Sequence, residues 1–177
     1  MSDPDFVLHY RLDQRDRIID TGGAWDRFAE ENDGGVLVGK SVLGRSLYDF
    51  ISGDVSRMFV RTIIDGVRIL QRPRNVPYRC DSPGLRRYME MSLTLEVGGE
   101  MLLAHRQLRT EESGRKFDFQ VGLQPVRQMI IRCSHCNGLK RHGVWGEAED
   151  ILPATTNALV PVIYGVCPRC LELVRQR

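Results

Sequence analysis

Two Cys-x-x-Cys motifs in the last third of the sequence constrain this chain more than any other feature. Cys133-Ser134-His135-Cys136 and Cys167-Pro168-Arg169-Cys170 are separated by 30 residues. Zinc binds four thiolates in a tetrahedron with Zn–S distances of about 2.3 Å, and each motif can supply two adjacent corners. The spacing is longer than in the commonest zinc fingers, but the pairing predicts one structural zinc ion. Its predicted ligands are Cys133, Cys136, Cys167 and Cys170.

The alternatives to structural zinc are an iron–sulfur site, a redox-labile zinc site and disulfides. A thioredoxin-like dithiol needs a single motif on a βαβ unit rather than two motifs in a tail. The first eight residues hold two aspartates and no basic residue, so no secretory signal is expected. A cytoplasmic location would keep the thiols reduced, which favours metal over disulfides. His135 and His142 could replace one thiolate, but they are expected to be bystanders.

Charge and hydropathy bear on the partners of the chain. No apolar run approaches the roughly 20 residues needed to span a bilayer, so no membrane association is expected. The net charge is +2, and residues 126–177 hold seven basic and four acidic residues. Four thiolates with Zn²⁺ would lower that local surplus of +3 to about +1. DNA-binding modules present a much stronger basic surface, which argues against nucleic acid as the main partner.

The first 73 residues of the 177 predict two strands followed by helices. Strand-forming residues separated by a turn predict strands at 6–12 and 17–20, the second ended by Thr21-Gly22-Gly23. Short helical pieces are expected at 24–32 and 43–51. Apolar residues then recur at spacings of three and four from Val55 to Leu70, which predicts a longer amphipathic helix over 54–71, stopped by Pro73.

The following residues predict β-structure. A short strand is expected at 76–80. From Met89 to Val97, apolar and polar residues alternate, which predicts a strand with one buried face. Gly98-Gly99 predicts a hairpin turn, and 101–108 is the expected return strand. Residues 110–125 are charged and turn-rich, so we expect a linker there between a domain at 6–109 and a module at 126–177.

The order of these elements resembles that of a PAS sensor domain over residues 6–109. Trp25 and Phe28 after the second strand, and the run Gly44-Arg45-Ser46-Leu47-Tyr48-Asp49-Phe50 before the longer helix, are similar to stretches of that family. The resemblance implies an α+β fold in which a five-stranded antiparallel sheet carries helices on one face. It also implies that a ligand, where one binds, lies between the sheet and the helices.

A small apolar ligand in such a cleft would contact the inward faces of the longer helix and of the sheet. The expected lining residues are Phe59, Ile63, Val67, Met89, Met91 and Leu93. The same periodic pattern is equally that of an ordinary packed core. Neither flavin nor haem is expected, because the flavin-binding Asn-Cys-Arg-Phe motif is missing and residues 54–71 contain no histidine. Cys80 is expected to be a buried, inert thiol.

Residues 126–177 resemble a zinc-binding tail that follows PAS or receiver domains in bacterial signalling proteins. The matching residues between the two motifs are Lys140-Arg141, Trp145, Glu149 and Gly165. Ile163-Tyr164 depart from the serine-histidine pair that the family usually has. The resemblance implies a small zinc-ribbon-like module, in which we expect Trp145 to pack over the metal site and Pro168 to begin a helix.

Together these patterns predict an intracellular protein that senses or transmits a signal through protein–protein contacts and is not an enzyme. A homodimer is a further expectation, with Phe6-Val7-Leu8 as one apolar segment that would serve it. The alternative is a zinc-dependent, nucleic-acid-binding transcriptional regulator. The C-terminal module is too small to bury much apolar surface, so zinc should supply most of its folding free energy. The domain at 6–109 is expected to fold without the metal.

Overall fold

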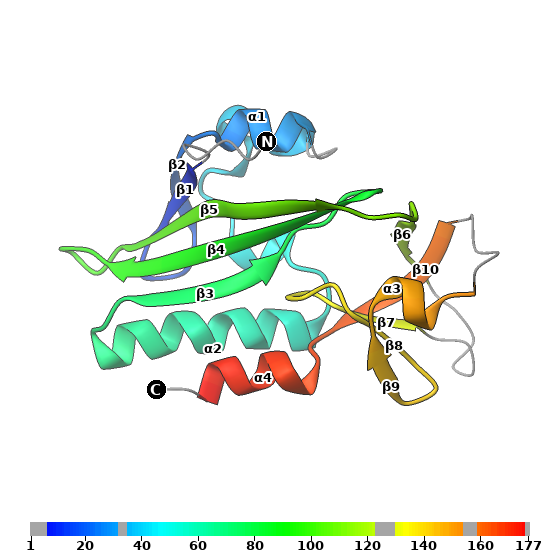
Figure 1. Cartoon of the computed structure of the whole chain (residues 1–177). Coiled ribbons are helices and arrows are strands. Elements are labelled where there is room, and N and C mark those ends of the chain that lie inside the picture. The colour runs from blue at the N-terminus through cyan, green and yellow to red at the C-terminus, as the bar shows by residue number, and fades with distance from the viewer. Residues whose placement is uncertain (1–6, 32–34, 123–129, 154–158, 176–177) are drawn as a thin grey trace.

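A computed structural model describes residues 7–31, 35–122, 130–153 and 159–175. Its strands form two five-stranded sheets, with a long helix packed along one of them (Figure 1). The fold is α+β, as predicted. Residue 6, residues 123–129, 154–158 and 176–177 lie outside the described residues, so the outer limits expected for the two parts are not placed by the structure.

The first sheet is antiparallel throughout and has the strand order β2-β1-β5-β4-β3. Its strands are β1 (Val7–Leu12), β2 (Ile18–Gly23), β3 (Arg74–Arg79), β4 (Leu85–Leu95) and β5 (Met101–Glu112). Each of the five strands predicted from the sequence is present. The predicted five-stranded antiparallel sheet is therefore confirmed.

Five helices precede β3 in the described part of the chain; the first two 3₁₀ helices were not predicted, and the other three lie close to their expected positions. The five helices are α1 (Trp25–Glu31), the 3₁₀ helices η1 (Gly35–Leu37), η2 (Gly39–Val42) and η3 (Leu47–Phe50), and α2 (Asp54–Leu70). The backbone of Gln71 ends α2 in the left-handed conformation, where its N–H donates to the carbonyl of Val67. The predicted inward face of α2 is buried, since Phe59, Ile63 and Val67 are at most 4% exposed.

Two local expectations for the first sheet were wrong. Val97 was expected on the buried face of a strand, but β4 ends at Leu95 and Val97 is fully exposed beside the Gly98-Gly99 turn. Gly22 and Gly23 were expected to break the second strand, yet both pair with β1. A Cβ atom on Gly22 would lie 2.6 Å from Nε2 of His9, so glycine allows the strand to continue there.

The segment 110–125, where we expected a linker, contains strand residues in its described part. Strand β5 extends to Glu112, and β6 (Asp118–Val121) pairs in parallel with β10 (Leu159–Gly165) of the second sheet. The charged, turn-rich composition reflects an exposed strand end followed by a short turn. The chain therefore passes from one sheet into the other within a few residues.

The second sheet has the order β6-β10-β7-β8-β9. Strand β10 runs parallel to β6 and β7, while β7, β8 and β9 form an antiparallel meander. The remaining elements of this part are β7 (Ile130–Cys133), β8 (Leu139–Arg141), β9 (Val144–Gly146), α3 (Ala148–Ile151) and α4 (Pro168–Arg175). Pro168 occupies the first position of α4, as the sequence predicts.

The two sheets share one hydrophobic core. A single buried cluster contains Phe59 of α2, side chains of the first sheet, and Cys133, Cys167 and Cys170. A smaller cluster belongs to the second sheet alone and contains Phe117, Leu139, Leu152, Val160 and Val162. The cysteine motifs are therefore packed against the first part of the chain rather than held apart from it.

Candidate metal centre

The first cysteine motif is a tight turn at the end of β7. Asn137 adopts a left-handed backbone with φ of 60°, and its N–H donates to the carbonyl of Cys133. The N–H of Cys133 in turn donates to the carbonyl of Gly138 at 2.8 Å. Asparagine tolerates this conformation better than most residues. The turn brings Cys133 and Cys136 to the same side of the chain.

The second motif joins β10 to the first turn of α4. The N–H groups of Cys170 and Leu171 both donate to the carbonyl of Cys167 at 3.0 Å. The N–H of Cys167 points at Sγ of Cys133, 3.4 Å away. Because Cys170 lies near the amino end of a helix, the helix dipole favours a thiolate at this position.

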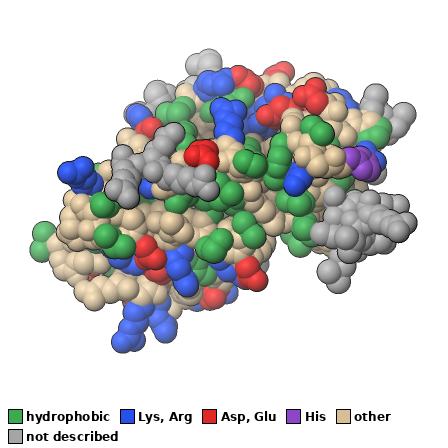
Figure 2. Space-filling model, turned by 90° about the horizontal axis from the view of Figure 1, so that it is seen from below, with side chains coloured by type: hydrophobic (Ala, Val, Ile, Leu, Met, Phe, Trp, Pro, Cys, Tyr) green, Lys and Arg blue, Asp and Glu red, His purple; other side chains and the backbone are tan. Residues whose placement is uncertain are grey.

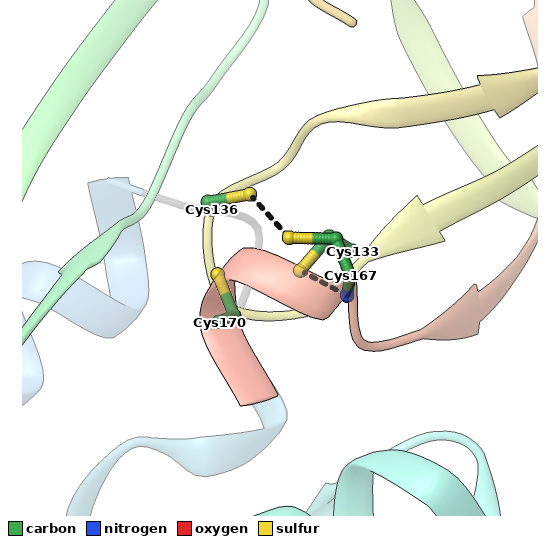
Figure 3. A group of neighbouring side chains, drawn as sticks. All are labelled: Cys133, Cys136, Cys167 and Cys170. Carbon is green, nitrogen blue, oxygen red and sulfur yellow. Dashed lines mark hydrogen bonds between the residues drawn. The ribbon is translucent and has the colours of Figure 1, made fainter. Parts of the chain in front are cut away.

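The four thiol groups point toward one another (Figure 3). Their sulfur atoms all lie within 4.8 Å of one another, and Sγ of Cys136 is 3.7 Å from Sγ of Cys167. A tetrahedron with metal–sulfur distances of about 2.3 Å has sulfur–sulfur distances of about 3.8 Å. The four predicted ligands are therefore brought together at a spacing that a tetrahedral metal ion fits.

Hydrogen bonds among Cys133, Cys136 and Cys170 shift the pKa values of these three thiols in opposite directions. Hydrogen bonds from Cys136 and Cys170 lower the pKa of Cys133 well below its ordinary value. The pKa of Cys136 rises to about 12 because its thiol donates to Cys133, and the pKa of Cys170 rises for the same reason. These shifts favour a thiolate at Cys133 and protonated thiols at Cys136 and Cys170. A divalent cation would displace these protons, as thiolate ligands require.

Strand β3 forms an edge of the first sheet, and the first cysteine motif lies against it. The N–H of Arg79 donates to the carbonyl of His135 at 2.9 Å, and Nδ2 of Asn137 donates to the carbonyl of Arg79 at 3.2 Å. These bonds satisfy backbone groups that an edge strand otherwise leaves open. The metal centre is thereby attached directly to the first sheet.

Ion pairs reinforce this attachment. The guanidinium of Arg79 contacts the carboxylates of both Asp81 and Glu147, with 2.8 Å to the nearer oxygen of Glu147. Burial alone would lower the pKa of Arg79, but its hydrogen bonds to these carboxylates outweigh burial and raise it. Next to it, Arg86 lies 2.5 Å from Glu149. The pairs Arg79–Glu147 and Arg86–Glu149 join β3 and β4 to the segment around α3.

The expectation that Trp145 packs over the metal site stays a prediction. Trp145 lies in β9 and is partly buried against the cluster that contains three of the four cysteines. Nζ of Lys140 lies 6.0 Å from the centre of its ring. The indole therefore packs against the core that the two sheets share.

The six residues expected to line a ligand cleft are all buried core residues. Their exposed fractions run from 0% at Leu93 to 9% at Met91. Five of them belong to the main cluster, and Met89 belongs to a smaller one with Leu8. No more than one of the six lines any single cavity described here. A ligand between these side chains therefore stays a prediction.

His105, His135 and Cys80 do not belong to the group of four cysteines. His105 of β5 is buried, and its Nδ1 lies 2.9 Å from the hydroxyl of Tyr78. His135 is buried between the sheets, and burial lowers its pKa. Cys80 follows β3, where burial raises the pKa of its thiol and makes it less reactive. The expectation that neither flavin nor haem is bound stays a prediction.

Sequence reasoning missed most of the contacts that attach the metal centre. Arg79, Glu147 and Asn137 carry no local pattern that distinguishes them from surface residues. Arg79 and Glu147 are 68 positions apart, so their pairing depends on how the two sheets meet. Glu149 was noted in the sequence, but its contact with Arg86 was not foreseen.

Comparison with family models found no match to this chain, and comparison with curated proteins found none either. Among the helices that the structure describes, none is both long and apolar enough to cross a bilayer.

Proposed function

We propose that this chain is a non-catalytic, cytoplasmic signalling protein in which a structural zinc ion fixes one sheet against the other. The observation that carries the proposal is the shared core, in which Cys133, Cys167 and Cys170 pack in the same cluster as Phe59 of α2. Loss of the metal would therefore disturb the packing of the first sheet. Such a link is what a protein needs to transmit a change from one part to the other.

Zinc is the metal that this ligand set favours. Four thiolates in a tetrahedron suit zinc or an iron site, and zinc needs no redox partner. The four cysteines would fill all four positions, whereas catalytic zinc sites keep one position open for water or substrate. A closed, largely buried set of ligands therefore supports a structural role.

The PAS resemblance supports a sensory role for the first part. Five antiparallel strands with a long helix along one face agree with the architecture that the resemblance implies. Output would then pass through a protein partner or a second copy of the chain. Hydrophobic, basic and acidic side chains are interspersed on the face of α2 and α4 seen in Figure 2. Met58 and Ile69, which are 62% and 78% exposed, offer apolar contacts on α2.

Nucleic-acid binding is the rival function to be tested. The full chain, analysed for zinc by native mass spectrometry, would be titrated against fluorescent duplex DNA and single-stranded RNA at low and physiological salt. We expect one bound zinc and no salt-dependent binding. Binding that weakens steeply with salt would support the transcriptional regulator instead.

The protein-contact proposal needs its own experiment. Proximity labelling in the source cells would compare the wild-type chain with Cys167→Ser and with the matched control Cys80→Ser. We expect a defined partner with the wild type and the control, and its loss with Cys167→Ser. Equal labelling by all three chains would contradict a role for the metal centre in signalling.

A further inference from the structure

The edge of the first sheet at β3 is covered at one end and open at the other. The first cysteine motif occupies both backbone groups of Arg79, because the N–H donates to the carbonyl of His135 and the carbonyl accepts from Asn137. Among the described residues, none covers Asn75 in the same way: this residue is exposed, and its backbone has no partner beyond the pairing of β3 with β4. An open strand edge of this kind is a template for a further strand.

The pairing with β4 decides which backbone groups of β3 face the open side. The N–H of Cys80 donates to the carbonyl of Arg87, and the antiparallel register continues from there to the pair Asn75 and Ser92 without a bulge. Hydrogen-bonded and non-hydrogen-bonded pairs alternate along such a ladder, so Asn75 belongs to a non-hydrogen-bonded pair. Its N–H and its carbonyl therefore both point away from β4, as those of Arg79 do.

A groove of about 840 Å³ lies beside this open edge, where β3 is next to α2 and α4 (Figure 1). We call it the edge groove. Its rim carries uncovered apolar side chains, since Ile69 is 78% exposed and Leu70 is 53% exposed. Gly66 gives it depth, because the nearest atom to a Cβ there would be Nη1 of Arg74, 4.0 Å away. The groove is lined by residues 66–67 and 69–70 of α2, residues 72–77, and Leu173 of α4.

Two prolines in this lining limit the length of an added strand. Pro73 and Pro77 have no N–H to donate. Pro77 also belongs to a non-hydrogen-bonded pair, so its missing N–H would have faced the open side. Of the residues between the two prolines, only Asn75 offers both an N–H and a carbonyl to an incoming chain. The edge is thus closed to long, indiscriminate pairing and open to one paired residue.

The pleat of the sheet fixes where the side chains of an added strand would lie. Asn75 points to the solvent face, whereas Val76 points to the α2 face and is 1% exposed. A residue paired with Asn75 would share its face, and the residues before and after that residue would point toward α2. Those two side chains would enter the edge groove, beside Ile69 and Leu70. The groove therefore suits two apolar side chains with one residue between them.

The charge of the lining adds a preference for an acidic chain. Two arginines line the edge groove and no acidic residue does. Arg72 is exposed at the rim. Acidic residues on either side of the apolar pair would complement this positive charge, which favours encounter and suppresses basic partners.

We propose that the edge groove binds an extended acidic segment of a partner protein, in which one residue exchanges two backbone hydrogen bonds with Asn75 and its two apolar neighbours enter the groove. This inference rests on the proposed function and deepens it, since it states how the partner is held. Helix α4 contains Cys170 and supplies Leu173 to the groove. Loss of the metal would displace this wall, which links the metal centre to partner binding.

The test uses the zinc-loaded full chain and the synthetic peptide acetyl-Glu-Glu-Val-Thr-Val-Glu-Glu-amide, whose threonine is the residue expected opposite Asn75. Nuclear magnetic resonance of the isotope-labelled chain gives both affinity and position. We expect a dissociation constant of roughly 0.1 to 1 mM, and slower hydrogen exchange at the amide of Asn75 in the complex.

Two methylated peptides separate backbone pairing from simple apolar contact. N-methylation of the threonine removes the N–H that donates to the carbonyl of Asn75, and should weaken binding about fivefold or more. N-methylation of the second valine is the matched control, because the N–H of that residue faces away from β3. It should change the affinity less than about twofold. A peptide with glutamine in place of every glutamate should bind about two- to fivefold more weakly.

Two substitutions of the same kind on α2 locate the site. Gly66→Leu places a side chain inside the edge groove and should weaken binding of the peptide at least about tenfold. Thr62→Leu is the control, because Thr62 is exposed one turn earlier on α2 and does not line the groove. It should leave the affinity within about twofold of wild type. Zinc content and circular dichroism of each variant establish that it has folded.

Absence of binding at about 5 mM peptide would overturn the inference, as would equal weakening by the two N-methyl groups or an unchanged affinity in a folded Gly66→Leu. If the peptide fails but a zinc-dependent partner is labelled in cells, the proposed function stands and that partner binds elsewhere. If the peptide binds as expected and no zinc-dependent partner is found, the edge groove stands and the signalling role does not.

Discussion

Arg79 and Glu147 hold the two sheets together at a point next to the metal centre. The guanidinium of Arg79 donates two hydrogen bonds, of 2.9 and 2.8 Å, to the two carboxylate oxygens of Glu147. The side chain of Arg79 is 11% exposed, whereas that of Glu147 is 43% exposed. Both bonds come from Nη1, whereas Nε and Nη2 of Arg79 donate to the carboxylate of Asp81. The partner that is more deeply buried is also the one that cannot lose its charge.

We expect the two partners to differ in their effect on stability. Arg79→Met leaves Asp81, whose side chain is 14% exposed, without its cation, and should lower the free energy of unfolding by roughly 3 kcal/mol. Glu147→Gln should cost about 1 kcal/mol or less, because its carboxylate is closer to solvent. Urea unfolding measures both. Arg106→Met, at a side chain 61% exposed, is the control, and an equal loss there would contradict this account.

Purified chain should contain one zinc ion per molecule. The four sulfur atoms are close enough for tetrahedral coordination, so Cys167→Ser should lose most of the metal. Cys80→Ser should keep it, because Cys80 lies outside the cluster. Elemental analysis by mass spectrometry gives the stoichiometry. Iron with sulfide, or equal zinc in both variants, would show that the metal or its ligands have been misassigned.

Removal of the metal should destabilise the whole chain rather than the second sheet alone. Three of the four cysteines share a buried cluster with α2, so the expectation that residues 6–109 fold without the metal is replaced by one of joint unfolding. Thermal unfolding followed by Trp fluorescence and by far-UV circular dichroism should show one transition, shifted to lower temperature by a chelator. Two transitions, the later one insensitive to the chelator, would restore the view of independent parts.

His105 should make stability depend on pH. Burial lowers its pKa from 6.5 to about 4, so the folded state prefers the neutral ring while the unfolded chain takes up a proton first. Its contribution is complete above pH 6.5 and is lost as pH falls toward 4, by up to roughly 3 kcal/mol.

Acid also releases metal from thiolates, which lowers stability by itself. The effect of His105 is therefore measured as a difference in the free energy of unfolding between two chains. The free energy of unfolding of wild type minus that of His105→Gln should decrease as pH falls between 6.5 and 4. Loss of zinc affects both chains equally and cancels. A difference that stays constant over this range would show that His105 is not protonated on unfolding there.

The sequence alone determined the local structure and the metal ligands. The patterns that predicted local structure depend on residues close to one another in the sequence, so a single sequence reveals them. They are the period-two alternation around Met91, the amphipathic face of α2 and the paired glycines at the hairpin. The sequence also predicted the metal ligands, because each Cys-x-x-Cys motif positions its two cysteines through its own short turn. The expectation was wrong at Gly22, where the structure depends on a residue distant in sequence. Glycine is needed there because the ring of His9, on the adjacent strand, leaves no room for a Cβ atom.

Only the tertiary structure decided how the two parts meet. The turn-rich segment after β5 has the composition of a linker, but its strand β6 pairs with β10, about 40 residues further along. Likewise, Arg79 and Glu147 look like surface residues until the sheets are packed. Such contacts arise from the docking of whole elements, and no local pattern of residues encodes that docking.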